Sequence, residues 1–451
     1  MSIKITMIGA GSTGFSLGIT REMLKSDLLK NARFVLMDIS PERLDKSYDR
    51  IMKLSSDYNA SFFVEKTLDS KRALENADFV ITSFAPHRQA FWASDIEIAA
   101  KHGVELLQGE NGGPAGQIHG LRNITILMNI VEDIKQLCPA AWLLNFTNPM
   151  SMLCTYLYKH TSIKSLGFCH QVHGSVGVIA EMLGMEPGGL EVISAGINHM
   201  NFLLDIRRKG SGESFIDEFF ERVKKSQYWQ KVANNIPEQL FTLEFLNTFG
   251  LYPIGYDTHI CEYIPFFYTP KEWKKIGYES ALTTISKLES VRENVDAKGT
   301  IDDVEIKRML GKDTFPFPAD PAGEYYKETP VEVIESLLKN TPKYLDAMVV
   351  QNKGSITNLP YDAVVDIPVV IVGGKARGNN VGELPVFAAE LCRRQIVIHE
   401  LVAQSAIQGD RQCFLQALCL DAHTTSLNQA RAIMNDYLNE YQEYLPAGLS
   451  R

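Results

Sequence analysis

Short apolar, β-branched runs alternate with stretches of helical spacing along the first part of the chain. Strands are predicted from these runs at Ile3–Ile8, Phe34–Met37, Ala77–Ser83, Trp142–Asn145 and Ser165–Phe168. Apolar positions at helical spacing predict helices at Gly14–Leu29, Pro41–Asp57 and Ile124–Leu137. Such alternation is typical of right-handed crossover units and a parallel sheet covered on both faces. The pattern therefore predicts a doubly wound α/β domain.

The alternation weakens after about residue 195. Ile197–Arg207 has the pattern of a sheet segment, whereas the polar, proline-containing stretch around 290–325 predicts a loop. Helical spacing returns at Glu213–Lys225, Pro330–Lys339, Val386–Gln408 and Asp410–Asn439, the last two forming a long amphipathic tail. We therefore expect two domains, an α/β domain at 1–195 and an α+β lobe at 196–451.

Composition and charge narrow the possible partners. Hydrophobic residues make up 45% and charged residues 22% of the 451 positions, which is ordinary for a globular protein. The 45 Lys and Arg against 54 Asp and Glu give a net charge of −9 without a long basic run, so nucleic acid is not expected as a partner. No window approaches the roughly 20 apolar residues of a membrane span. The N-terminal segment lacks the pattern of an export signal, and a cytoplasmic protein with reduced cysteines is expected.

A glycine-rich turn follows the first predicted strand and opens the first helix. Its sequence is Gly9-Ala10-Gly11-Ser12-Thr13-Gly14, and the next strand ends at Asp38. In such a turn the first glycine permits the bend, the second lets a pyrophosphate approach, and the third allows close helix packing. Asp38 would accept hydrogen bonds from ribose hydroxyls, which favours NAD over NADP. The context predicts a Rossmann-type domain similar to lactate and malate dehydrogenases; the alternative is a glycine-rich turn that binds nothing.

Two further clusters contain candidate metal ligands. Cys169 and His170 follow the end of a predicted strand, where the ligand crevice of an open parallel sheet lies, and His199 opens the second lobe. A thiolate and an imidazole can bind a transition-metal ion. On spacing alone, a buried thiol and a core histidine explain the same residues. Arg88 also follows a strand end, and it is predicted to contact substrate or cofactor, with an exposed loop as the equal alternative.

Several segments together resemble glycoside hydrolase family 4. They are the Gly9-x-Gly11 turn, Asn145-Phe146-Thr147-Asn148-Pro149-Met150, Cys169-His170-Gln171-Val172, Gly196-Ile197-Asn198-His199 and Asn358-Leu359-Pro360. That family contains NAD- and Mn-dependent α-galactosidases, α-glucosidases, α-hexuronidases and 6-phosphoglycosidases, and it lies outside the usual two-carboxylate mechanism. The resemblance implies NAD and Mn²⁺, or another divalent metal, as cofactors.

The resemblance also implies roles for particular residues. Cys169 and His199 match the metal ligands, while Asn148 and Glu110 match positions at the sugar. His170 is implicated in acid/base work, and Asp257 matches the base of non-phosphosugar members. Tyr256 or Tyr263 remain alternatives for the base. One departure is the segment Glu110-Asn111-Gly112-Gly113-Pro114-Ala115-Gly116, which differs from the family's usual loop and places His119 near an expected arginine.

The implied reaction is an oxidation–elimination route without net consumption of NAD. A hydride leaves carbon 3 of the sugar, a base removes the proton on carbon 2, the aglycone departs from carbon 1, water adds, and the hydride returns. A metal would stabilise the enediolate, and an acid would assist the leaving group. The expected enzyme is therefore a glycosidase.

The residues after Cys169 bear on the choice of sugar. Phosphosugar members tend to have proline two positions after a Cys-Asn or Cys-Asp pair, whereas this chain has Gln171 and Val172. A small non-phosphorylated α-glucoside or α-galactoside is therefore expected, with an α-hexuronide or a 6-phosphoglycoside as the alternative. The other hypotheses for the function are an NAD-dependent hydroxyacid or polyol dehydrogenase and a catalytically inactive NAD-binding sensor. The amphipathic tail favours a homo-oligomer, either a dimer or a tetramer.

Overall fold

The computed structural model describes residues 3–58, 63–225, 240–255, 257–266, 269, 272–273, 280–283 and 329–449. The chain divides into two compact units that interleave along the sequence. The first unit comprises Met1–His87, Gly120–Cys169 and Glu328–Glu383; the second comprises Arg88–His119, His170–Lys327 and Leu384–Arg451. Tyr256 and the predicted loop at 290–325 lie outside the described residues.

The sheet of the first unit begins with parallel strands in the order β3-β2-β1-β4-β5-β6. They are β1 (Lys4–Ile8), β2 (Arg33–Met37), β3 (Phe63–Thr67), β4 (Phe79–Thr82), β5 (Trp142–Asn145) and β6 (Lys164–Gly167). Every residue of β1 and β4 is buried, because such strands are covered on both faces. This order is that of a dinucleotide-binding Rossmann fold, and it confirms the predicted doubly wound sheet.

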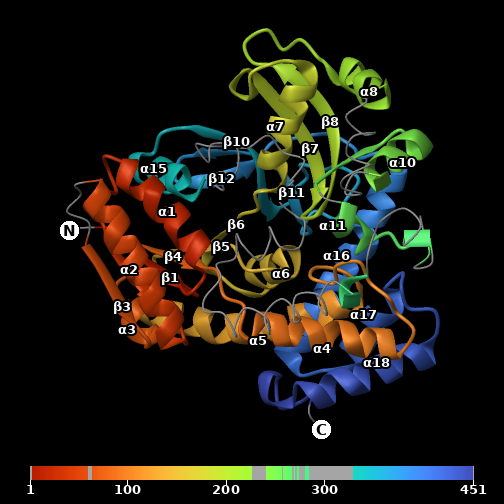
Figure 1. Ribbon diagram of the computed structural model, residues 1–451, viewed down its shortest axis with the longest axis horizontal. Helices are drawn as coiled ribbons and strands as arrows, with labels where there is room; N and C mark the ends of the chain where they lie inside the picture. Colours follow the sequence, from red (N-terminus) through yellow and green to blue (C-terminus); the bar gives the residue numbers. More distant parts are fainter. Residues whose placement is uncertain are drawn as a thin grey trace, which may run out of the picture. The chain divides into compact units, whose positions relative to one another are not determined.

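Helices of the first unit include a closely packed pair at its N-terminal end. They are α1 (Thr13–Lys25), α2 (Pro41–Asp57), α3 (Ser70–Leu74), α6 (Met150–His160) and α15 (Pro330–Lys339). Helices α1 and α2 lie side by side (Figure 1). The α2 helix begins after Ser40, whose hydroxyl accepts a hydrogen bond from the Arg43 N–H, and it buries Leu44 and Ile51.

An antiparallel extension completes the sheet of the first unit. Strand β10 (Lys343–Gln351) pairs with β6, β11 (Val364–Val372) pairs with β10, and β12 (Lys375–Gly378) pairs with β11. Gly167 permits the pairing of β10 with β6, since a Cβ there would lie 2.9 Å from Cβ of Val349. The sequence pattern did not predict this extension, which comes from a part of the chain assigned to the other domain.

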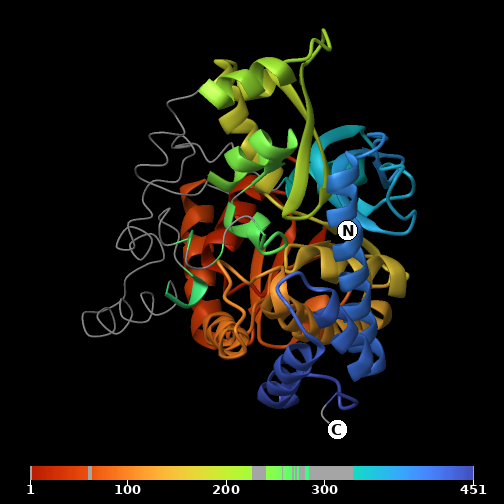
Figure 2. The same cartoon turned by 90° about the vertical axis from the view of Figure 1, so that its right-hand side faces the viewer.

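The second unit contains a three-stranded antiparallel segment and a group of helices. Its strands are β7 (Leu190–Ile197), β8 (Met200–Arg208) and β9 (Tyr252–Ile254), and β7 and β8 form a long hairpin (Figure 2). Its helices include α4 (Arg88–Lys101), α7 (Gln171–Leu183), α8 (Ile216–Lys225), α10 (Leu240–Phe249), α11 (Asp257–Cys261), α16 (Val386–Gln408), α17 (Arg411–Leu420) and α18 (Leu427–Glu440). A small apolar core joins Leu107, Phe241, Cys261 and Trp273.

The predicted elements are largely present, with differences that have local causes. Strand β3 was not predicted, since it is an edge strand of mixed pattern in which Phe63 is exposed. Helix α5 (Gly113–Leu137) begins earlier than expected, and the predicted tail helix is broken between Leu420 and Leu427. None of the helices in the described part of the chain is long and apolar enough to cross a membrane.

The compact units do not follow one boundary near residue 195. The segment 88–119 joins the second unit although it precedes that boundary, and 328–383 joins the first unit although it follows it. The strand pairing of β10 with β6 explains the second case. The division into two domains at residue 195 therefore stays a prediction from the sequence, while the compact units of the structure consist of other segments.

Candidate active site

The glycine-rich turn of the first unit is held by backbone contacts. The N–H groups of Gly9 and Ala10 both donate to the carbonyl of Met37, at 2.9 and 3.0 Å. Gly9 has a φ of 90°, and a Cβ there would lie 2.3 Å from the carbonyl oxygen of Ser83. Only glycine fits this position, because an added side chain would collide with fixed backbone.

Asp38 lies at the end of β2 and contacts the same turn. Its Oδ2 accepts the Gly11 N–H at 2.8 Å, and its Oδ1 accepts the Ser40 N–H at 2.9 Å. Ser12 precedes α1 without a side-chain cap, and no acidic residue occupies the first turn of that helix, which starts at Thr13 and Gly14. Free helix N-terminal amides favour an anion. The turn therefore has the amides and the carboxylate that a dinucleotide needs.

The turn after β5 contains Asn148. Asn145 organises this turn: its Oδ1 accepts the Thr82 hydroxyl at 2.9 Å, and its Nδ2 donates to the Thr147 carbonyl at 3.0 Å. The Asn148 carbonyl accepts a hydrogen bond from Nδ2 of Asn123 at 2.6 Å, and the Asn148–Pro149 peptide is cis. The Asn148 side chain is half-buried. Cys169, two residues after β6, is also half-buried.

His199 occupies the tight turn between β7 and β8 in the second unit. Ile197 and Met200 pair across that turn, and His199 has a φ of 65°. A left-handed backbone at a residue other than glycine costs about 1–3 kcal/mol and tends to occur at functional positions. Gly196 permits the turn, since a Cβ there would lie 2.3 Å from the Met200 carbonyl oxygen.

Burial sets the charge of the His199 ring. Its pKa lies well below the usual value, first because the ring is buried and then because His259 and His170 lie near enough to repel a second positive charge. The ring is therefore neutral at pH 7, the form in which imidazole binds metal ions. His170 itself is exposed and immediately precedes α7.

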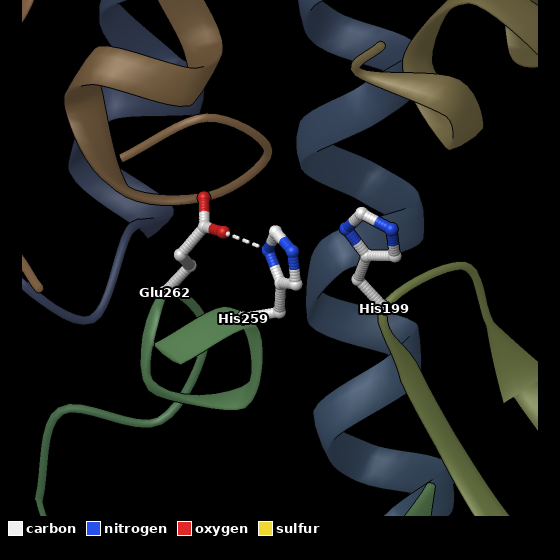
Figure 3. A group of neighbouring side chains, drawn as sticks. All are labelled: His199, His259 and Glu262. Carbon is white, nitrogen blue, oxygen red and sulfur yellow. Dashed lines mark hydrogen bonds and ion pairs between the residues drawn. The ribbon is translucent and has the colours of Figure 1, made fainter. Parts of the chain in front are cut away.

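His259 and Glu262 lie next to His199 (Figure 3). The rings of His199 and His259 have centroids 4.1 Å apart and are tilted by 33°. Nδ1 of His259 lies 2.8 Å from Oε1 of Glu262. One ligand atom from each of the three residues lies within 4.8 Å of the others, so this group could hold or support a metal ion.

Arg88 and Glu110 form an ion pair, with 2.9 Å between Nη2 and Oε1. The Glu110 side chain is 13% exposed and that of Arg88 is 64% exposed. His119 Nδ1 contacts the Glu110 carbonyl at 2.9 Å, so the histidine at the expected arginine position supports the loop backbone. The structure thus brings two of the predicted substrate residues together.

The Asp257 carboxylate accepts hydrogen bonds that the sequence did not predict. Its side chain is fully buried, Oδ2 accepts the Phe241 N–H at 2.8 Å, and Oδ1 accepts the N–H and hydroxyl of Thr242 at 3.0 and 2.7 Å. These contacts cap α10. They favour a capping role, and the assignment of Asp257 as catalytic base stays a prediction. Tyr263, the alternative, is buried, with its hydroxyl 3.5 Å from the Asn198 carbonyl.

Sequence reasoning did not find His259 and Glu262. The spacing of three residues places both at one end of α11, and that spacing was the available signal. Their partners are Asn111, Gly112 and His199, which are distant in the sequence.

Comparisons with known proteins cover almost the whole chain. The model "Family 4 glycosyl hydrolase" matches residues 4–185, and "Family 4 glycosyl hydrolase C-terminal domain" matches residues 194–424. An alpha-galactosidase of Bacillus subtilis (strain 168) is 30% identical over 98% of this chain and 99% of that protein. An alpha-glucosidase of Erwinia rhapontici is 29% identical over 96% of each.

A solved structure shares the fold. It is a 6-phospho-alpha-glucosidase from gut microorganisms in complex with NAD and Mn²⁺, with a TM-score of 0.77 at 19% identity over 99% of each chain. Together the matches define an enzyme of the glycosyl hydrolase class. The chain belongs to family 4 of that class, as its motifs indicated.

Proposed function

We propose that this enzyme hydrolyses a small non-phosphorylated α-glycoside, an α-glucoside or an α-galactoside, with NAD and a divalent metal ion such as Mn²⁺ as cofactors. The names of the two relatives support the choice of sugar. The NAD and Mn²⁺ in the structural relative support the choice of cofactors.

The residues of this chain fit both cofactors. Gly9 and Gly11 let the turn lie close against Ser83 and Asp38, where a Cβ would collide, and the N-terminus of α1 offers amides to a pyrophosphate. His199 is a buried neutral imidazole, and with the Cys169 thiol it would hold the metal ion. Bound NAD would supply a reversible hydride acceptor for the sugar ring, and a divalent metal ion held by these residues would supply Lewis-acid stabilisation of negative charge on the sugar oxygens.

Other side chains would position the sugar and move protons. Glu110 would accept hydrogen bonds from sugar hydroxyls, and the Asn148 amide would accept or donate them. His170 is exposed and would protonate the leaving oxygen. The base that removes the carbon 2 proton is predicted to be Asp257, with Tyr263 as the alternative that the capping contacts of Asp257 favour.

Charge at the Glu110 loop favours a neutral sugar. Arg88 is already paired with Glu110, so the pair carries no net charge. A uronide or phosphate group would compete with Glu110 for the Arg88 guanidinium, which this pair already uses. A hydroxyl would instead donate to the Glu110 carboxylate.

One observation carries the proposal. His199 is held in a left-handed turn with a buried, neutral ring, within a chain whose other unit has a dinucleotide turn. A hydroxyacid or polyol dehydrogenase of the lactate and malate type needs a dinucleotide turn and a base but no metal ligand, whereas the redox-neutral glycosidase also needs a metal ligand.

The test is hydrolysis of nitrophenyl α- and β-glycosides, with NAD and Mn²⁺ each present or omitted. The panel contains neutral sugars, uronides and 6-phosphosugars, and both nitrophenol and NADH are measured. We expect cleavage of a neutral α-glycoside that needs both additions, with no build-up of NADH. Preference for a uronide or phosphosugar would overturn the choice of sugar. NADH accumulating on a hydroxyacid or polyol without cleavage would favour the dehydrogenase, and no turnover with retained NAD binding would favour the sensor.

Two further expectations belong to the same proposal. A homo-oligomer, dimer or tetramer, is checked by light scattering of the purified chain. The cytoplasmic location expected from the sequence stays a prediction, which fractionation of the source cells would check.

A further inference from the structure

The loop that carries Glu110 has its backbone held by side chains of neighbouring elements. Nε1 of Trp92, on α4, donates to the Gln108 carbonyl at 2.8 Å. Nδ1 of His119, on α5, lies 2.9 Å from the Glu110 carbonyl. These contacts fix the backbone immediately before Glu110 and at Glu110 itself, so the Glu110 side chain starts from a defined position.

Glu262 holds the next two residues of the same loop. Its side chain is 0% exposed, and Oε2 accepts the N–H groups of Asn111 and Gly112, the latter at 2.8 Å. Gly112 permits this approach, since a Cβ there would lie 2.5 Å from the backbone oxygen of Glu262. Figure 3 shows the carboxylate against the neighbouring loop. A buried carboxylate needs donors and buried amides need an acceptor, so each group stabilises the other.

Asn111 connects this anchor to the Glu110 carboxylate. Its Nδ2 donates to Oε2 of Glu110 at 3.4 Å, a long hydrogen bond, while Nη2 of Arg88 donates to Oε1 at 2.9 Å. Both carboxylate oxygens therefore have a donor from the protein. The direction of the Glu110 carboxylate thus depends on the place of the Asn111 backbone, which Glu262 fixes.

We propose that Glu262 is a positioning residue for the sugar, which orients the Glu110 carboxylate through the backbone of Asn111 and Gly112. Both oxygens of the buried Glu262 carboxylate already have partners in the protein, so Glu262 acts through the loop and not on the sugar itself. A displacement of about 1 Å in such a group can cost about 100-fold in rate. The inference rests on the proposed function, because it takes Glu110 as a sugar-binding residue.

The test is a double-mutant cycle between Glu262 and Glu110. Glu262→Leu removes the acceptor, whereas Glu262→Gln keeps one oxygen for the two amides. Each is made in the wild type and in Glu110→Ala. The matched control is Asp95→Asn, since Asp95 is another buried carboxylate of the second unit and accepts the Tyr441 hydroxyl at 2.6 Å.

Three quantities are measured for each protein. They are kcat and KM on the glycoside that the wild type cleaves, Mn²⁺ affinity from the EPR signal of free Mn²⁺, and hydrogen exchange of the peptide 108–113 by mass spectrometry. The exchange reports the anchoring of the loop without depending on turnover, because it follows the amides that Glu262 binds.

We expect Glu262→Leu to lower kcat/KM about 10- to 100-fold, mainly by raising KM, and to speed exchange of the peptide. Glu262→Gln should lose less than about fivefold, because the neutral oxygen still accepts the amides. In the Glu110→Ala background both changes should lower kcat/KM less than about twofold, since the group that they position is absent. Mn²⁺ affinity should stay within about threefold throughout, and Asp95→Asn should behave as the wild type.

The outcomes separate the two proposals. A wild type that cleaves no glycoside, or an unchanged kcat/KM in Glu110→Ala, would overturn the assigned role of Glu110 and this inference with it. Unchanged kcat/KM in Glu262→Leu, equal losses in both backgrounds, or a parallel loss of Mn²⁺ affinity would overturn the positioning role alone. If Glu262→Leu does not fold, Gly112→Ala carries the same cycle, because its Cβ would push the loop away from Glu262.

Discussion

The glycine-rich turn of the first unit and the histidine cluster of the second are built from different parts of the chain. The turn uses backbone amides and the close packing that Gly9 and Gly11 permit, and the Asp38 carboxylate accepts the Gly11 N–H. The cluster uses side chains: buried Glu262 contacts half-buried His259, whose ring packs against that of buried His199. One region recognises a ligand by shape and backbone, and the other by polar groups taken out of water.

This difference determines how each region fails. A turn made of backbone is damaged by adding atoms, because little space is left around it. A buried polar cluster is damaged by removing or recharging a group, because each partner then loses a contact it cannot replace with water. Substitutions can therefore test the two regions separately.

The largest effect is expected from His199→Asn. Asparagine tolerates the left-handed backbone at this turn, so the variant should fold. We expect kcat/KM for the cleaved glycoside to fall about 1000-fold, equivalent to about 4 kcal/mol of transition-state stabilisation. NAD affinity should stay within about twofold. Equal loss of NAD binding would mean that the two regions are not independent. The control is His102→Asn, which removes a histidine that contacts Asp436 at 2.8 Å.

Gly11→Val should have the next largest effect, and on the other cofactor. A Cβ at Gly11 would lie 2.7 Å from Oδ2 of Asp38 and 2.9 Å from Cβ of Arg43. Overpacking of this kind costs about 1–3 kcal/mol, so NAD affinity should fall about 10- to 100-fold, measured by fluorescence titration. Gly18→Ala is the matched control on α1, since a Cβ there meets nothing within 4 Å. Unchanged NAD affinity in Gly11→Val would place the cofactor elsewhere.

Asp257→Ala separates a capping role from a catalytic one. Loss of the carboxylate leaves the amides of Phe241 and Thr242 without their acceptor, and the free energy of unfolding should fall by about 2 kcal/mol. Urea denaturation measures this change. Asp410→Ala, at the cap of α17, is the comparison and should cost about 1 kcal/mol. A variant of unchanged stability with abolished turnover would instead support Asp257 as the base.

Acid should act on the second unit through His399, a buried residue of α16. Burial lowers the pKa of His399 to about 3. As the pH falls, His399 is therefore protonated in the unfolded chain before it is protonated in the folded one. The contribution of neutral His399 to stability is complete above about pH 6.5, and below it the free energy of unfolding falls by up to about 1.4 kcal/mol per pH unit. Urea denaturation between pH 7 and pH 4 should show a shallower slope for His399→Gln.

The sequence predicted the parallel sheet because its signals are local. Helix α2 and strand β5 have the predicted bounds, since caps and apolar runs lie within each element. The antiparallel extension was not predicted, because the pairing of β10 with β6 joins residues far apart in the chain. Apolar runs indicate strands but do not identify their neighbours.

The same limit applies to the candidate site. The glycine turn could be predicted because Gly9 to Asp38 form one short crossover unit. His259 and Glu262 could not, because their meaning depends on Asn111 and His199 being close in space. Asp257 shows what a family match leaves out: its carboxylate accepts hydrogen bonds at the start of α10, contacts that the motif does not indicate, and its role as base stays a prediction.

The interleaving of the two units affects how the protein can be made on the ribosome. The first unit is complete only when residues as far as Glu383 have been synthesised, because β10, β11 and β12 belong to it. The parallel strands are synthesised long before. Strand β6 therefore lacks its neighbour β10 while most of the second unit is translated. An unpaired strand edge invites association with other chains. Nascent chains stalled before β10 are therefore the species that should need chaperones most.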